Sequence, residues 1–358
     1  MTRRVGICTG GGDAPGLNAV IRAFVKHGVR AHGWDIVGIE DAFNGLLETP
    51  RRLQALDLKS CRGLLHRGGT VLGTTNRGDP FGFPSADGPV DRSEELARAV
   101  SEEGLEGLVV VGGDGTQAIG LRLMRERGVR VVGVPKTIDN DLSATDFTFG
   151  FMSAVEVATD ALDRLHTTAE SHDRVLFLEV MGRDAGHIAL YTGMAGGADV
   201  ILIPEIPYDP LAVAAKIKER KARGRPFSTV VVAEGALPHG APAGRAARHE
   251  RLRAGRGAAA VAMSALEGLI EAEMRAVVLG HVQRGGSPVA FDRILATRFG
   301  VEAVHLVAAD RWGEMVRLRD GHVCGVALEE AVQQRLVDPK GELLQAARAS
   351  GVTFGASG

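Results

Sequence analysis

The chain has 358 residues, which fits about two domains, and its 45% hydrophobic and 24% charged residues are typical of a packed globular protein. Its 44 acidic and 42 basic side chains leave a net charge of −2, which argues against a nucleic-acid-binding protein and confines any anion site to a local cluster. There is no signal-peptide pattern or apolar run of ~18 residues, and the three cysteines are widely spaced, so we expect a cytoplasmic protein with reduced thiols and no membrane partner.

Short apolar runs alternate along the chain with longer segments of helical periodicity. This alternation predicts an α/β fold in which mainly parallel sheets are covered by helices on both faces. The expected strands are 5–9, 35–39, 105–111, 129–134, 174–180, 199–203, 228–233 and 276–279, and the expected helices include 17–29, 116–127, 151–169 and 211–223. Residues 238–257 lack an apolar period and are expected to form a mobile surface loop, whereas 315–327, with Asp320-Gly321 at its centre, reads as a β-hairpin.

A glycine-rich turn, Gly10-Gly11-Gly12-Asp13-Ala14-Pro15-Gly16, joins the first strand to the first helix. Such glycines let the backbone approach a ligand, and the N-terminus of the following helix offers N–H groups to phosphate. The spacing matches neither the Walker motif nor the dinucleotide fingerprint, which disfavours a P-loop enzyme and an oxidoreductase. Taken alone, the turn fits phosphate binding and a purely geometric role equally well.

A second glycine-rich turn, Val111-Gly112-Gly113-Asp114-Gly115-Thr116, ends the third strand. Open α/β sheets bind ligands at this edge. Asp114 could hold Mg²⁺ beside phosphates, or it could cap a helix that starts near Thr116, and the motif alone leaves both roles open.

A third segment, Pro135-Lys136-Thr137-Ile138-Asp139-Asn140-Asp141, places two carboxylates after a short strand. One carboxylate can accept the proton of an attacking hydroxyl, while the other orients a metal-bound water or a loop. The segment therefore reads as the edge of an active site.

In order and spacing, these segments resemble the phosphofructokinase family. The resemblance continues in Glu179-Val180-Met181-Gly182-Arg183 and in Gly280-His281-Val282-Gln283-Arg284-Gly285-Gly286-Ser287-Pro288, so it covers most of the chain. It implies a glycolytic 6-phosphofructokinase that transfers the γ-phosphoryl of ATP to the 1-hydroxyl of fructose 6-phosphate. It also implies two similar three-layer lobes with the active site in the cleft between them. A donor lobe would comprise 1–150 and about 283–335, and a sugar-phosphate lobe 151–282 and about 336–358.

The resemblance also implies roles for individual residues. Asp139 would be the catalytic base, with Lys136 and Thr137 beside the transferring phosphoryl, Arg183 as the cation that meets its developing charge, and Asp114 at the Mg²⁺ site. The donor-binding residues would be Gly12, Arg77, Gly78, Gly113, Asp114, Gly115 and Thr116. The sugar phosphate would contact Thr137, Ile138, Asp139, Arg174, Met181, Gly182, Arg183, Glu234, Arg275, His281, Val282, Gln283 and Arg284.

In the family, the equivalents of Arg174 and Arg275 come from a neighbouring subunit, which implies a homo-oligomer, either a dimer or a tetramer. Arg77 departs from the family pattern, because Asn76 stands where the usual arginine is expected. Arg22 and Lys26 fall on positions that bind effector phosphates in allosteric members, but exposed basic residues on a helix fit them equally well.

Two positions bear on the phosphoryl donor. Gly115 leaves room for the α-phosphate of ATP, whereas Lys136 is typical of pyrophosphate-dependent members, so the pair resembles an intermediate subfamily. We favour ATP, with pyrophosphate as the alternative. The NAD and lipid kinases share only the Gly-Gly-Asp-Gly turn, and the intact Asp114, Asp139 and Arg183 argue against a non-catalytic regulatory homologue.

Overall fold

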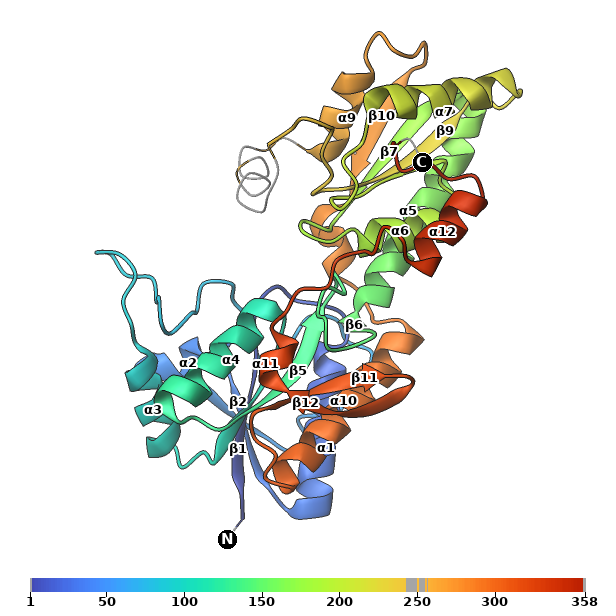
Figure 1. Ribbon diagram of the computed structural model, residues 1–358. Coiled ribbons are helices and arrows are strands. Elements are labelled where there is room, and N and C mark those ends of the chain that lie inside the picture. Colours follow the sequence, from blue (N-terminus) through green and yellow to red (C-terminus); the bar gives the residue numbers. More distant parts are fainter. Residues whose placement is uncertain (1, 243–249, 251–254, 256, 357–358) are drawn as a thin grey trace. The chain divides into compact units, whose positions relative to one another are not determined.

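The computed structural model describes residues 2–242, 250, 255 and 257–356, and these residues form two compact units (Figure 1). Unit 1 comprises Met1–Ser153 and Arg284–Gln334, and unit 2 comprises Ala154–Gln283 and Arg335–Gly358. Most of the loop predicted over 238–257 falls outside the described residues. Within the described ranges, every helix is too short or too polar to cross a membrane.

Unit 1 contains a mixed sheet in which parallel pairing dominates. Its described strands follow the order β12-β11-β5-β4-β1-β2-β3, with β6 paired to β5, and only β3 and β12 run antiparallel to their neighbours. The strands are β1 (Arg4–Thr9), β2 (Asp35–Ile39), β3 (Leu53–Leu56), β4 (Gly107–Gly112), β5 (Val131–Thr137), β6 (Phe149–Gly150), β11 (Glu314–Arg319) and β12 (His322–Ala327). The predicted hairpin is confirmed, and its turn residues Asp320 and Gly321 both have positive φ, at 49° and 79°.

Helices cover both faces of this sheet. Along β4, Val109 and Val111 join one apolar cluster, while Leu108 and Val110 join another on the opposite face. The first cluster is completed by α1 (Leu17–His32) and α10 (Ala290–Ala308), and the second by α2 (Asn44–Leu47), α3 (Ser93–Glu102), α4 (Asp114–Arg127) and α11 (Leu328–Ala331). Burial on both faces explains why these strands are continuous apolar runs in the sequence.

Unit 2 repeats this layering on a smaller, parallel sheet. Its described strands follow the order β10-β7-β9-β8, with bounds β7 (Val175–Val180), β8 (Val200–Leu202), β9 (Ser228–Ala233) and β10 (Met274–Val278). Apolar residues of α7 (Pro210–Ala222) and α9 (Ala258–Leu266) pack on one face. On the other face, α5 (Phe151–His172) packs against Leu176 and α6 (His187–Ala195) against Ile201; α12 (Glu342–Ala349) lies near the C-terminus.

The α/β fold is thus confirmed, and the two units share their layering but differ in strand number. In both units, the turns that carry the sequence motifs follow the carboxyl ends of neighbouring parallel strands: β1, β4 and β5 in unit 1, and β7, β9 and β10 in unit 2. Parallel pairing brings these turns to one edge of each sheet.

Candidate active site

The glycine turn after β1 is held against two other segments of unit 1. The Gly10 amide donates to the carbonyl of Val111 at 2.9 Å, and the Gly11 amide donates to Thr75 at 3.1 Å. A Cβ on Gly10 would lie 2.7 Å from the Thr116 methyl group, so the buried Thr116 side chain fills the space beside the turn. The structure therefore brings together three of the segments predicted to bind the donor, around residues 10–12, 74–77 and 113–116.

Two cations hold the carbonyl groups of this turn. The Lys136 ammonium donates to the Gly12 carbonyl, and the Arg284 guanidinium donates to the Asp13 carbonyl at 3.1 Å. A Cβ at Gly12 would lie 2.5 Å from Arg284 Nη1, so a side chain here would have to displace the guanidinium. Arg284, predicted to bind the sugar phosphate, therefore lies in unit 1 beside the donor turn.

Lys136 is buried, with 3% of its surface exposed. Burial, followed by the nearby Arg284 charge, lowers the pKa of its ammonium from 10.5 to about 8, against the opposing effect of Asp139, Asp13 and Asp141. In the free chain, this turn therefore carries a cation whose charge changes near pH 8.

The loop after β5 fixes the backbone around Asp139. The Asp139 amide donates to the Thr137 hydroxyl at 3.0 Å, and the Thr148 amide donates to Asn140 Oδ1 at 3.0 Å, with Asn140 at a φ of 53°. Ile138 is only 1% exposed, so it can offer little more than its backbone to a ligand. These bonds fix the backbone from which the Asp139 side chain extends in the free chain.

A second carboxylate, Asp141, lies close enough to Asp114 for the Asp114 charge to raise the Asp141 pKa. Burial, and then the Asp114 charge, raises the pKa of the Asp141 carboxyl, which also accepts from Gln334 at 3.2 Å. Asp114 is the first residue of α4, and Gly113 is the N-cap, so Asp114 is not the cap of a helix beginning near Thr116. The sequence motif contained Asp141, but its closeness to Asp114 became visible only in the structure.

This carboxylate pair fits Mg²⁺. Mg²⁺ in phosphoryl-transfer sites is bound by one or two carboxylates, with substrate phosphates and water completing its shell. The described residues contain no cluster of three or more acidic, histidine or cysteine side chains suited to a metal, so an all-protein cage is not formed there. Asp114 and Asp141 match the one or two carboxylates that a phosphate-shared Mg²⁺ would take from the protein.

Gly115 is exposed, and its glycine identity has no explanation in packing. A Cβ at this position would meet nothing within 4 Å, and its φ lies outside the left-handed region. A side chain here would extend into open space beside the turn that carries Asp114.

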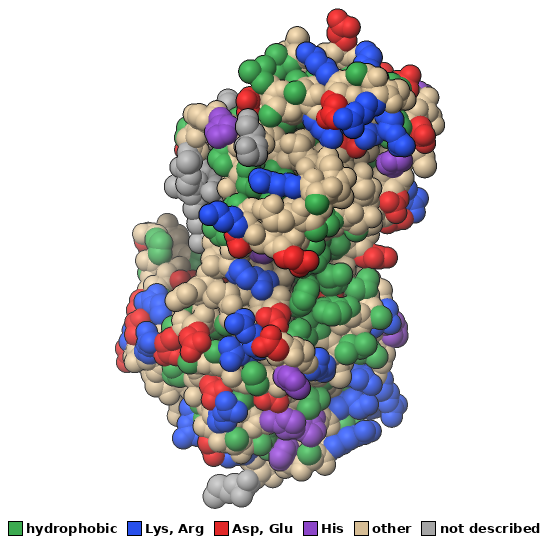
Figure 2. Space-filling model, turned by 45° about the vertical axis from the view of Figure 1, so that its right-hand side comes forward, with side chains coloured by type: hydrophobic (Ala, Val, Ile, Leu, Met, Phe, Trp, Pro, Cys, Tyr) green, Lys and Arg blue, Asp and Glu red, His purple; other side chains and the backbone are tan. Residues whose placement is uncertain are grey.

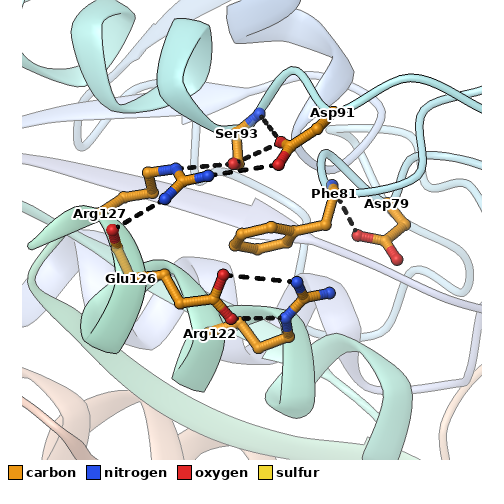
Figure 3. Close-up of polar contacts among 7 residues, drawn as sticks. All are labelled: Asp79, Phe81, Asp91, Ser93, Arg122, Glu126 and Arg127. Carbon is orange, nitrogen blue, oxygen red and sulfur yellow. Dashed lines mark hydrogen bonds and ion pairs between the residues drawn. The ribbon is translucent and has the colours of Figure 1, made fainter.

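Arg77 and Gly78 precede Phe81 in the sequence. Phe81 docks on α4 (Figure 3). The Phe81 ring lies between two guanidinium groups of that helix, with Cζ of Arg122 at 3.7 Å and Cζ of Arg127 at 5.7 Å from its centroid. Arg127 also pairs with Asp91 at 3.2 Å. These contacts fasten the segment that follows Arg77 to the helix that begins with Asp114.

A second group of predicted residues meets within unit 2. The Met181 amide donates to the Gln283 side chain at 2.7 Å, and the Gly235 amide donates to the Gly182 carbonyl at 3.1 Å. The Glu234 amide donates to the carbonyl of the last β7 residue at 2.9 Å. The predicted sugar-binding residues Met181, Gly182, Arg183, Glu234 and Gln283 thus share one edge of the sheet, with His281 and Val282 exposed on the adjoining 3₁₀ turn η1 (Gly280–Arg284).

Arg174 and Arg275 lie at the other end of the same sheet. Arg174 precedes β7 and Met181 follows it, so the strand separates them by about 20 Å within one chain. Both arginines pair with Glu273, at 2.8 Å and 2.5 Å. A single unit 2 therefore cannot bring them to the edge that carries Arg183.

Arg22 and Lys26 line a cavity of about 440 Å³ in unit 1, together with Arg30 and Arg62. Four cationic side chains around one cavity could bind an anion. This lining is compatible with both expectations for Arg22 and Lys26, effector binding and simple exposure.

The sequence of the chain is similar to sequences of known proteins. The family model described as Phosphofructokinase matches residues 4–307. The chain is 50% identical over 356 residues to an ATP-dependent 6-phosphofructokinase of Chloroflexus aurantiacus, covering 99% of this chain and 98% of that protein. It is 47% identical over 335 residues to a pyrophosphate–fructose 6-phosphate 1-phosphotransferase of Amycolatopsis mediterranei, covering 92% and 95%.

Among solved structures, the chain is similar to phosphofructokinase from Saccharomyces cerevisiae, with a TM-score of 0.77 and 30% identity. The similarity covers 92% of this chain but only 45% of the yeast chain, so this protein spans less than half the length of that relative.

Proposed function

Because the chain belongs to the phosphofructokinase family, we propose that it is a 6-phosphofructokinase that transfers the γ-phosphoryl of ATP to the 1-hydroxyl of fructose 6-phosphate, giving fructose 1,6-bisphosphate. The observation that carries the proposal is the convergence, at one sheet edge of unit 1, of two glycine turns, the Asp114–Asp141 pair and the loop of Asp139. This reaction belongs to glycolysis, and three cysteines without a disulfide support a cytoplasmic location.

Donor binding is assigned to the turns of unit 1. The N-terminus of α4 presents amides of Gly113–Thr116 to phosphate, and the charges of Lys136 and Arg77 balance the polyphosphate. Asp114 and Asp141 would hold Mg²⁺, which neutralises phosphate charge when it is bound.

Asp139 is the proposed general base. Its carboxylate accepts the proton of the 1-hydroxyl as that oxygen attacks the γ-phosphorus, while the bond from the Asp139 amide to Thr137 keeps the loop in place. Arg183 supplies positive charge to the transferring phosphoryl, and its Nε pairs with Asp184 at 3.2 Å in the free chain.

Sugar binding is assigned to both units. Glu234 accepts hydrogen bonds from hydroxyl groups of the sugar, and His281 and Arg284 bind the 6-phosphate. The remaining proposed contacts are Ile138, Met181, Gly182 and Val282.

Arg174 and Arg275 are proposed to serve the site of a neighbouring subunit in a homo-oligomer. Their separation from Arg183 by the length of β7 supports this assignment. The strand that carries Arg275 is also an edge strand, and it exposes Val278 at 61%. An exposed apolar edge strand is a surface that a partner chain commonly covers. On the face drawn in Figure 2, acidic and basic side chains are interspersed over the upper part, whereas Lys and Arg side chains gather at the lower right.

The open surface at Gly115 favours ATP as the phosphoryl donor. The fold does not require glycine there. The family resemblance implies that a position without a side chain leaves room for the α-phosphate of ATP. Pyrophosphate is the second candidate, because Lys136 lies at the turn and can bind either polyphosphate.

A coupled assay with fructose 6-phosphate and either Mg-ATP or Mg-pyrophosphate tests the proposal. We expect turnover with ATP. Turnover with pyrophosphate alone would overturn the donor assignment but keep the reaction class, and no turnover with either donor at any protein concentration would overturn the function itself. Gly115→Asp is the matched variant: it should raise KM for ATP by at least about tenfold through lost space and charge repulsion, with unchanged thermal stability.

A further inference from the structure

Two glutamines lie fully buried beneath the motif turns, one in each unit. Gln283 of unit 2 and Gln117 of unit 1 each have 0% of their surface exposed. Buried carboxamides are costly unless hydrogen bonds satisfy them, so their partners show what the side chains do. Among the described residues, Gln117 Oε1 has no partner, so the role of this side chain is argued from its Nε2.

Gln283 joins the edge of the unit 2 sheet to the start of a helix. Its Oε1 accepts the Met181 amide at 2.7 Å, and its Nε2 lies 3.5 Å from the Ala154 carbonyl in the first turns of α5. Both ends of the carboxamide therefore face protein backbone. Gln283 was expected to contact the sugar phosphate, but its side chain is directed to these backbone groups instead.

The bond to Met181 bears directly on Arg183. Met181 begins a tight turn in which Gly182 has a φ of 129°. On its other side, Gly235 packs so closely that a Cβ there would overlap the Arg183 carbonyl. Without Gln283, the Met181 amide would lose its partner on one side of a turn that Gly235 confines on the other.

Gln117 has the corresponding place in unit 1. Its Nε2 lies within hydrogen-bond distance of three carbonyls, those of Val110 at 3.3 Å, Gly112 at 3.0 Å and Val134 at 2.9 Å. These carbonyls belong to β4 and β5 just before their carboxyl ends. The side chain thus ties together the strands that carry the Asp114 turn and the Lys136–Asp139 loop.

We propose that Gln283 and Gln117 are positioning residues, each serving one substrate. Gln283 holds the Met181–Arg183 turn in the geometry that binds the sugar phosphate, and Gln117 holds the two donor turns in register. Neither side chain touches a substrate. This inference rests on the proposed function, because it assigns the two turns to different substrates.

Steady-state kinetics of Gln283→Leu and Gln117→Leu test the proposal as a double comparison. Gln283→Leu should raise KM for fructose 6-phosphate about tenfold or more and leave KM for the donor within about twofold. Gln117→Leu should raise KM for the donor about tenfold or more and leave KM for fructose 6-phosphate within about twofold. Gln345→Leu is the control, since Gln345 is exposed on α12 and its Nε2 donates to the carbonyl of Pro339 at 3.3 Å, away from the motif turns; the kinetics of this variant should be those of the wild type.

The conservative variant Gln283→Glu gives an independent readout. A carboxyl group keeps the acceptor for the Met181 amide at any pH, but it can donate toward Ala154 only when protonated. KM for fructose 6-phosphate in this variant should therefore approach the wild-type value at low pH and rise relative to wild type as pH increases. The pH series of Gln283→Glu also tests the proposal if Gln283→Leu does not fold.

A merely structural role for the glutamines predicts a different pattern. If each variant changed both KM values to the same extent, or if Gln283→Leu bound fructose 6-phosphate as tightly as the wild type in calorimetry, the positioning role would be overturned. Wild-type turnover with ATP is measured first and tests the proposed function by itself, so failure of that function and failure of this inference are distinguishable.

Discussion

At the scale of one residue, a substitution of Asp139 should separate the chemical step from substrate binding. Asp139→Ser removes the carboxylate that would accept the hydroxyl proton but keeps the backbone bond to Thr137. We expect kcat to fall by about 10² or more with little change in either KM, because general-base assistance acts mainly in the transition state. A variant with near wild-type kcat would remove Asp139 from this role.

The charge of Lys136 should make kcat/KM for the donor depend on pH, and the burial of this side chain sets the direction of the change. Burial lowers the pKa of its ammonium to about 8, so the free enzyme loses this cation as pH rises through that value. Since the charged form attracts the donor polyphosphate, kcat/KM for the donor should fall above pH 8. Lys136→Met should lack this limb of the profile while retaining other pH effects.

The same residue should affect stability in the opposite direction. A folded-state pKa below that of a free lysine means that the unfolded chain binds more protons between about pH 8 and 10.5, so the Lys136 contribution to the free energy of unfolding increases across this window. Parallel decreases of stability and donor affinity above pH 8 would contradict the assignment to Lys136.

At the scale of elements, the packing of α1 against α10 depends on Gly300. A Cβ at Gly300 would lie 2.6 Å from the Val20 carbonyl and 2.8 Å from Ala23 Cβ. Gly300→Val should therefore lower the free energy of unfolding by about 1–3 kcal/mol, measured by denaturant titration. Ile294→Val, at a 62% exposed position of the same helix, is the control and should change it by less than about 0.5 kcal/mol.

The sequence allowed most of the central strands and long helices to be predicted, because burial on both faces produces uninterrupted apolar runs such as 107–112. It missed elements with weaker patterns, such as β3, a four-residue edge strand whose residues are mostly half-buried or exposed. Edge strands carry no strong apolar signal.

The site was predicted unevenly for a similar reason. The motifs indicated Asp114, Lys136 and Asp139, because each follows a strand in a distinctive segment. The approach of Asp141 to Asp114 and the contact of Arg284 with Asp13 depend on tertiary packing, which spacing along the chain cannot reveal. The burial of Gln283 was hidden for the same reason.

For the whole molecule, the distance between Arg275 and Arg183 along the sheet of unit 2 predicts complementation between subunits. Asp139→Asn and Arg275→Ala chains should each be nearly inactive alone. After unfolding and refolding together, mixed oligomers should gain activity well above the sum of the two, because some sites combine an intact Asp139 from one chain with an intact Arg275 from the other. Mixtures that stay as inactive as their components would show that each chain builds its site alone.

Finally, the open surface at Gly115 has an evolutionary consequence. A substitution that meets no neighbouring atom carries little cost in folding, so this position can change without compensating changes elsewhere. Selection for a different donor could then act on one exposed residue while the rest of the sequence drifts slowly. Overall identity would therefore be a poor guide to donor use, in keeping with relatives of 50% and 47% identity that are named for different phosphoryl donors.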